Sequence, residues 1–117
     1  MKWVKQSIHY WCPDTKEHKF LGQNVTVAIL DTGISPHPDF KDRILSFRDF
    51  SSTTGSSEKV LFSFSHFSPL IDNSGHGTHV AGILAGSGLL SSGTYAGIAP
   101  FCNLIIGKVL DQNGNGS

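Results

Sequence analysis

An apolar run at residues 25–30 constrains the fold of this chain more than any other feature. The run is short, contains several β-branched side chains, and stops at the polar residue Asp31. Such a pattern predicts a strand that is buried on both faces, as strands of parallel sheets are. Further apolar runs at residues 44–47 and 104–110 predict two more strands.

One helix is predicted between the second and third strands, at residues 76–86. The turn-forming residues 72–75 precede it and are typical of a helix start. Val80, Ile83 and Leu84 have the spacing of one apolar helix face. Small Gly and Ala residues elsewhere in the segment would let the helix axis approach its neighbours closely. The order of strand, loop, helix and strand predicts an α/β fold with parallel strands.

The remaining segments are predicted to be loops or an arm. Residues 33–39 contain two prolines and are predicted to form a loop. Residues 51–68 are rich in serine and are predicted to form a surface loop that includes a short extended segment. Residues 87–93 consist mostly of residues with small side chains and are predicted to form a third loop. Residues 1–22 show no sustained hydrophobic periodicity, which favours an N-terminal arm that lies over the core. Residues 23–117 are expected to form the main domain.

The charge balance of the 117-residue chain excludes some partners. Nine Lys and Arg residues match nine Asp and Glu residues, and no local patch of one sign is found. The long-range field that draws a protein to nucleic acid or to an anionic membrane is therefore missing, and we predict neither partner. No apolar run of about 18 residues occurs, so no transmembrane span is predicted. The oligomeric state is left open.

The first residues favour a cytoplasmic location. Lys2 and Lys5 would suit the charged start of a signal peptide, but residues 7–14 interrupt the sequence before an apolar segment can form. The protein therefore either stays inside the cell or begins elsewhere in nature. Cys12 and Cys102 can form one bridge or stay reduced, so they do not identify the redox compartment.

Asp31 and His76 are the residues best placed for chemistry. Asp31 stands at the carboxyl end of a predicted strand, where ligands bind in open α/β sheets. His76 begins the predicted helix between two glycines, where no bulky neighbour in the chain shields its ring. An aspartate and a histidine can support a serine nucleophile, because the imidazole takes the serine proton while the carboxylate holds the tautomer. Each also has a structural alternative, a turn or cap for Asp31 and a structural histidine for His76.

Two other kinds of site are less well supported. His76 and His79 could share a metal with Asp31, but zinc hydrolase helices more often use histidines four residues apart with an intervening Glu, which is lacking here. A dinucleotide site is excluded, since Gly86 and Gly88 follow a helix instead of a strand and the third glycine is absent.

Two long blocks resemble the subtilisin-like serine proteases, the subtilase family. Residues 27–34 resemble the block around that family's catalytic aspartate, and residues 73–82 resemble the block around its catalytic histidine. They occur in the family's order, Asp before His. Shorter matches lie at residues 37–40, 97–100 and 108–110. The resemblance spans about residues 22–117 and is most like bacterial members that act in the cytoplasm.

The resemblance implies a serine-type endopeptidase and the N-terminal portion of a subtilisin-like fold, a mostly parallel sheet flanked by helices. Asp31 would orient the imidazole, and His76 would be the general base and acid. His79 would be a structural helix residue. The backbone from Leu110 to Gly114 would pair with an extended polypeptide substrate, in the way an added strand does.

Two departures from the family pattern matter. The resemblance allows calcium at Asp39, but the loop at residues 87–94 lacks Asn and Asp, so no metal or other cofactor is assigned. The family's serine and oxyanion-hole Asn blocks are not found before Ser117. We therefore expect a peptidase domain that is incomplete as given and an isolated chain without hydrolytic activity. The alternative is a non-catalytic remnant or peptide-binding module.

Overall fold

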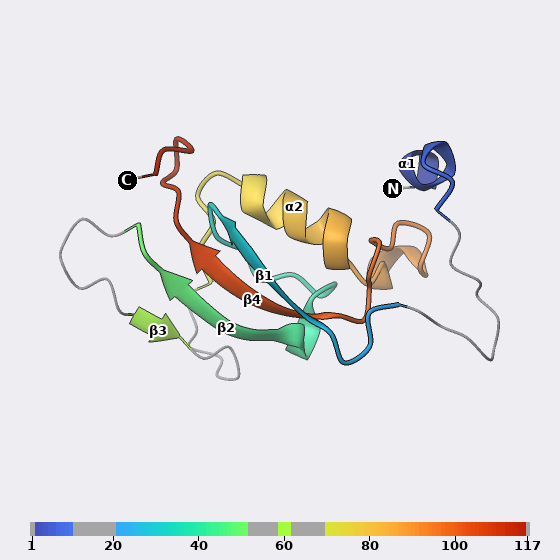
Figure 1. Ribbon diagram of the computed structural model, residues 1–117, viewed down its shortest axis with the longest axis horizontal. Helices are drawn as coiled ribbons and strands as arrows, with labels where there is room; N and C mark the ends of the chain where they lie inside the picture. Colours follow the sequence, from blue (N-terminus) through green and yellow to red (C-terminus); the bar gives the residue numbers. More distant parts are fainter. Residues whose placement is uncertain (1, 11–20, 52–58, 62–69, 117) are drawn as a thin grey trace.

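The protein is built around a four-stranded sheet with a ten-residue helix across one face (Figure 1). The computed structural model describes residues 2–10, 21–51, 59–61 and 70–116. The elements in chain order are α1 (Lys2–Ser7), β1 (Thr26–Asp31), β2 (Ile44–Asp49), β3 (Lys59–Leu61), α2 (His76–Ala85) and β4 (Asn103–Lys108), with 3₁₀ turns at Lys41–Arg43 and Leu89–Ser91.

The sheet is mostly parallel, as the sequence predicts. Its strand order is β1-β4-β2-β3, and β4 pairs in parallel with both β1 and β2. β3 supplies the short extended piece expected within residues 51–68 and pairs antiparallel with β2. The α/β fold class is therefore confirmed, with α2 as the connection that returns the chain to the sheet.

The predicted element boundaries move by a few residues. β1 includes Asp31 as its last residue, β2 continues to Asp49, and β4 ends at Lys108 instead of residue 110. β2 can lengthen because it pairs along β4 as far as Asp49 and Lys108. A shift in register between Ile44 and Ser46 lets Ile44 and Phe47 both be buried.

The prediction that β1 is buried on both faces is wrong. Ile29 is buried, but its neighbour Leu30 is 66% exposed. The first half of β4 alternates in the same way, since Leu104 and Ile106 are buried while Ile105 is 41% exposed, whereas its last three residues are all buried. In the described part of the chain, α2 covers one face of the sheet (Figure 1), and the core contains residues from β1, β2 and β4.

The predicted apolar face of α2 is confirmed in part, because Val80 and Leu84 pack against the core but are only half-buried. The buried residues of the helix are Gly77, Ala81 and Ala85, whereas Ile83 is 39% exposed. The close approach expected from the small residues is confirmed, because a Cβ at Gly77 would lie 2.2 Å from the carbonyl oxygen of Gly33. The first turn of α2 therefore packs directly on the end of β1.

The parallel strands end where α2 begins (Figure 1). This places Asp31, the last residue of β1, beside His76, the first residue of α2. Lys108, the last residue of β4, lies opposite Asp31 in the sheet. The core beneath contains residues from the strands, the helix and the loops between them, namely Ile29, Ile34, Phe40, Ile44, Phe47, Ala81, Ala85, Cys102, Leu104 and Ile106.

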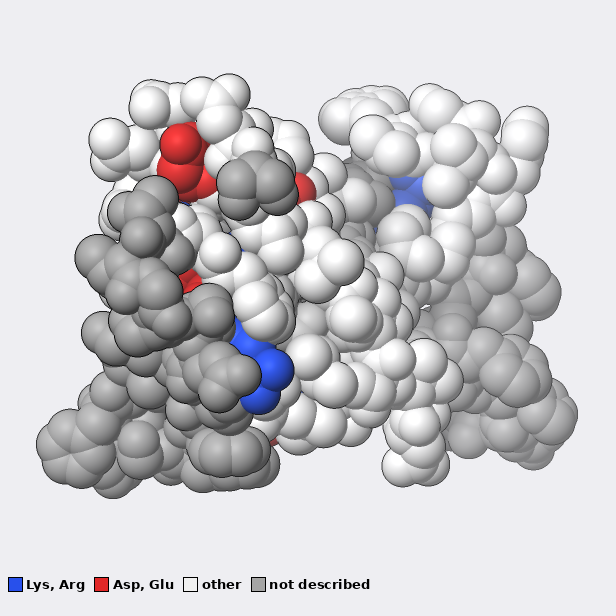
Figure 2. All heavy atoms as spheres, turned by 60° about the vertical axis from the view of Figure 1, so that its left-hand side comes forward, with Lys and Arg blue, Asp and Glu red and all other residues white. Residues whose placement is uncertain are grey.

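Much of the predicted arm lies outside the described residues, Cys12 included. The described part forms α1 and reaches the main body through Tyr10, whose hydroxyl donates to the carbonyl of Ile98 at 2.8 Å. No helix in the described part of the chain is long and apolar enough to span a membrane. Figure 2 shows the described charged side chains of one face scattered among uncharged residues.

Candidate active site

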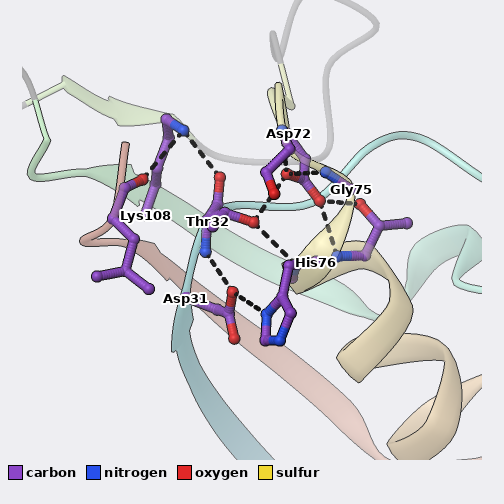
Figure 3. Close-up of polar contacts among 10 residues, drawn as sticks. Asp31, Thr32, Asp72, Gly75, His76 and Lys108 are labelled. Carbon is purple, nitrogen blue, oxygen red and sulfur yellow. Dashed lines mark hydrogen bonds and ion pairs between the residues drawn. The ribbon is translucent and has the colours of Figure 1, made fainter. Parts of the chain in front are cut away.

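The structure brings Asp31 and His76 into direct contact. Asp31 is the last residue of β1 and His76 the first of α2, and the imidazole Nδ1 lies 2.8 Å from Oδ1 of Asp31 (Figure 3). The same carboxylate oxygen accepts the backbone N–H of Thr32 at 2.7 Å. The Asp31 side chain is 12% exposed and that of His76 is 65% exposed.

This contact determines what each ring nitrogen can do. Because a carboxylate only accepts hydrogen bonds, Nδ1 carries the proton and Nε2 keeps its lone pair. Nε2 of His76 has no hydrogen-bond partner among the described residues. The exposed ring can therefore accept a proton at Nε2 while the largely buried carboxylate of Asp31 stabilises the resulting imidazolium.

Asp72 holds the start of α2, a role that the sequence analysis missed. Gly75 occupies the cap position with φ of 89° and makes no side-chain capping bond. The carboxylate of Asp72 caps the helix instead. It accepts hydrogen bonds from the N–H groups of Ser74 at 3.1 Å and of Gly75 and Thr78 at 2.8 Å. It also accepts the Thr78 hydroxyl. The available signal was an Asp just before a predicted helix start, within residues 72–75.

The hydrogen bonds to Asp72 also control its protonation. Burial alone would raise the pKa of this carboxyl, but bonds from Thr78, Gly75 and Thr32 more than offset that effect. The pKa of Asp72 therefore lies well below its usual range. The group is a carboxylate at the positive end of the α2 dipole, where a negative charge is favourable.

Thr32 connects this carboxylate to the end of β1. Its hydroxyl donates to Asp72 Oδ1 and accepts the N–H of Gly77, both at 2.8 Å. Its carbonyl accepts the ammonium of Lys108 at 2.8 Å (Figure 3). Thr32 is 1% exposed and Lys108 4% exposed, so these are buried polar groups with their partners in place. No sequence pattern predicts a role for either residue.

Leu110 lies next to Asp31, whereas Gly114 lies in a turn farther along. The N–H of Leu110 donates to the carbonyl of Asp31 at 3.2 Å. Gly114 donates its N–H to the carbonyl of Asp111 at 2.9 Å and has φ of 81°. A Cβ on Gly114 would meet nothing within 4 Å, so the turn conformation, not crowding, explains the glycine.

The surroundings of Asp39 do not fit calcium. Its two carboxylate oxygens accept N–H groups of Gly88 and Leu89, each at 3.2 Å. Calcium needs six to eight oxygen ligands, and N–H donors facing the carboxylate do not provide them. Across the described ranges, no three His, Cys, Asp or Glu residues are grouped to hold a metal ion. The histidine metal site considered from the sequence therefore has no structural support.

A cavity of about 630 Å³ beside α2 does not contain the Asp31–His76 pair. It is lined by Gly75, Thr78 and His79 on the helix side, and by residues of the 35–40 loop. Because the cavity lacks the coupled acid and base, we locate the candidate site by the Asp31–His76 contact instead.

Comparisons with known proteins support one family. The sequence model of the Subtilase family matches residues 22–117. The chain is 48% identical over 96 residues to "Serine protease AprX" of Bacillus subtilis (strain 168), covering 82% of this chain and 19% of that protein. It is 41% identical over 97 residues to the "Major intracellular serine protease" of the same organism, covering 81% and 27%.

A solved structure agrees with these relatives. The CspB protease of Clostridium perfringens matches with a TM-score of 0.67 and 30% identity, over 83% of this chain and 23% of that one. The chain thus spans about a fifth to a quarter of the length of the proteins it matches. The family resemblance and the subtilisin-like fold predicted from the sequence are confirmed.

Proposed function

Because the chain belongs to the subtilase family, we propose that it supplies two members of a serine-protease triad. Asp31 orients the imidazole, and His76 serves as general base and then as general acid. The observation that carries this proposal is the 2.8 Å contact from Nδ1 of His76 to Oδ1 of Asp31. The His76 side chain is 65% exposed, which leaves Nε2, on the opposite edge of the ring, for a reacting group.

The reaction follows from the two nitrogens of His76. A serine hydroxyl gives its proton to Nε2 as its oxygen attacks the carbonyl carbon of a peptide bond. Asp31 stabilises the imidazolium through Nδ1–H. Nε2–H then protonates the leaving amine, and water hydrolyses the acyl-enzyme by the same steps, with His76 again taking and returning a proton.

No serine of this chain is assigned as the nucleophile. None has the family's Gly-Thr-Ser context, and no serine hydroxyl in the described ranges is hydrogen-bonded to His76. We therefore propose that the 117-residue chain has no hydrolytic activity by itself.

The proposed substrate is an extended polypeptide that lies along the backbone from Leu110 to Gly114. The N–H of Leu110 on the carbonyl of Asp31 supports this, because it brings that segment to the proposed acid–base pair. Main-chain pairing of this kind recognises the peptide backbone more than its side chains. We also propose a cytoplasmic location, supported by relatives that are named as intracellular proteases.

A fluorophosphonate probe tests the nucleophile proposal, because it labels serines that a working base activates. We expect no covalent labelling of the 117-residue chain at neutral pH, and labelling would overturn its proposed inactivity. The positive arm is a chimera in which residues 22–117 replace the matching segment of AprX. We expect this chimera to be labelled.

Substitutions in the chimera test the two roles. His76→Ala and Asp31→Asn should lose rapid labelling, because the serine then has no correctly held base. His37→Gln is the matched control, since His37 is another partly exposed histidine and contacts Asp39 instead of the proposed pair. Labelling that persists in His76→Ala at the control rate contradicts the proposed base.

A further inference from the structure

We propose that Asp72 and Thr32 form a clamp that positions the His76 ring against Asp31, which makes Asp72 a positioning residue. The clamp is defined as the Asp72 carboxylate, the Thr32 hydroxyl, and the N–H groups of α2 that they bind. This inference rests on the proposed function, because it assigns how the acid–base pair of that site is held together.

The ring of His76 needs such support because little packing fixes its position. Its side chain is 65% exposed, and its hydrogen bond is the one to Asp31. The place of the imidazole therefore depends on where the backbone of the first α2 turn stands relative to the end of β1. A displacement of about 1 Å in such a group can lower a catalytic rate about a hundredfold.

The clamp holds that first turn from both sides. Asp72 accepts the N–H of Gly75 just before His76, and the N–H and hydroxyl of Thr78 just after it. The hydroxyl of Thr32 accepts the N–H of Gly77. Backbone N–H groups on either side of His76 are thus bound by two side chains that lie outside the helix.

Thr32 makes this support specific to the pair. Thr32 is the residue directly after β1, and Gly77 is the second residue of α2. The bond between Thr32 and Gly77 therefore joins the neighbours of Asp31 and His76, whose own contact is drawn in Figure 3. The two backbone segments are therefore joined twice at adjacent residues.

Further contacts prevent Thr32 from moving alone. Its N–H donates to Asp31, its carbonyl accepts the buried ammonium of Lys108, and its hydroxyl donates to Asp72. Asp72 stays ionised over the pH range in which a histidine titrates, since hydrogen bonds hold its pKa well below the usual carboxyl range. The clamp therefore keeps its charged acceptor while His76 gains and loses a proton.

The tautomer of His76 gives a direct readout. With the ring held against Asp31, Nδ1 is protonated and Nε2 is not. A ring released from Asp31 exchanges between both neutral tautomers. Long-range ¹H–¹⁵N spectra of the full 117-residue chain, labelled with ¹⁵N-histidine at a pH where the ring is neutral, distinguish the two cases.

A matched pair of variants isolates the hydroxyl. Thr32→Val keeps the shape but removes the group that joins Asp72 to Gly77, and we expect a mixture of His76 tautomers. Thr32→Ser keeps a hydroxyl, and we expect it to restore the Nδ1–H form. Asp72→Asn should also give a mixture, because an amide nitrogen cannot accept the Thr78 N–H and hydroxyl.

The control is Asp49→Asn, because Asp49 also accepts an N–H and a hydroxyl, both from Ser51. We expect it to retain the Nδ1–H form. Amide signals of Leu104 and Ile106 in β4 report whether the sheet is intact in each variant. If Asp72→Asn loses them, the comparison of Thr32→Val with Thr32→Ser decides the question.

Two results would overturn the clamp. One is an unchanged Nδ1–H form in Thr32→Val and Asp72→Asn. The other is a wild-type chain whose His76 ring already exchanges between tautomers. The first result leaves the contact of His76 with Asp31 intact and so contradicts the clamp alone. The second result contradicts that contact as well, and therefore also the proposed function. In the AprX chimera, Asp72→Asn should lower kcat about tenfold to a hundredfold with KM within about twofold.

Discussion

Two aspartates, Asp72 and Asp111, collect backbone N–H groups in similar turns, yet they connect very different parts of the molecule. Asp111 accepts the N–H groups of Asn113 and Asn115, two and four residues farther along. Asp72 binds the first turn of α2 and also Thr32, which lies 40 residues away in the sequence. The carboxylate of Asp111 therefore stabilises only its own turn, whereas that of Asp72 connects the start of α2 to Thr32, the residue after β1.

The pKa values of Asp72 and Asp111 are both lowered, so the lowering alone does not distinguish the two aspartates; their hydrogen-bond partners do. The pKa of Asp111 is lowered, chiefly by the N–H of Asn115. That of Asp72 is lowered although burial opposes it, because the Thr78 hydroxyl and nearby N–H groups bind the charged form. A low carboxyl pKa thus identifies a well-bonded carboxylate, and the location of its partners decides whether it supports a loop or a site.

The largest difference is expected when each carboxylate is removed. Asp72→Ala should lower the free energy of unfolding by about 3 kcal/mol, because several donors, the buried Thr32 hydroxyl among them, lose a charged acceptor. Urea denaturation of the full chain measures this. A loss below about 1 kcal/mol would mean that water replaces Asp72 at little cost.

Removing the long-range partner should have a smaller effect. Thr32→Val leaves the N–H of Gly77 without its acceptor and removes one of the donors to Oδ1 of Asp72, which keeps the N–H groups of Ser74 and Gly75. We expect a loss of about 1–2 kcal/mol by urea denaturation. Thr32→Ser is the control and should recover most of the stability. Equal losses in both variants would show that the methyl group, not the hydroxyl, is what matters.

Acid should weaken the Asp72 contacts in a defined direction. Because the pKa of Asp72 is lower in the folded protein, the stabilisation is complete above its ordinary unfolded value of about 4. It is lost as the pH falls through the folded value. Asp72→Asn should therefore flatten the decline in unfolding free energy below about pH 4. An unchanged decline would assign it to other carboxyl groups.

The smallest effect is expected at Asp111. Asp111→Asn should leave the free energy of unfolding unchanged within the error of urea denaturation, since the carboxylate binds its own exposed turn. Amide exchange of Asn113 and Asn115 should become faster, while that of Thr78 stays the same. A change at Thr78 would show that the two turns are coupled.

The sequence predicts the pair itself because each residue follows a local pattern. Asp31 ends an apolar run and His76 begins a segment of small residues after a turn, so both positions follow from neighbouring residues. The clamp does not follow in this way. Asp72 and Asp111 each precede a short polar segment that contains glycine, and only the contact of Asp72 with Thr32 across the fold distinguishes the two aspartates.

The burial of β1 and α2 departs from the prediction for related reasons. The apolar run of β1 cannot reveal whether its second face is covered, and Leu30 proves to be 66% exposed. In α2 the apolar spacing indicates Val80 and Leu84, which are half-buried, but the fully buried residues are the small ones, Gly77, Ala81 and Ala85. The small size of Gly77 allows close contact with Gly33, just after β1. Hydrophobic spacing detects large side chains and overlooks an interface made by small ones.

The most direct test of the central claim is the kcat for peptide hydrolysis by the AprX chimera that carries residues 22–117. For a triad of this kind, loss of the histidine lowers kcat about a millionfold, and loss of the aspartate about ten-thousandfold. We expect His76→Ala and Asp31→Asn to follow that order, with His37→Gln close to the unsubstituted chimera. A His76→Ala chimera that keeps kcat within about tenfold would contradict the assignment of His76 as the general base.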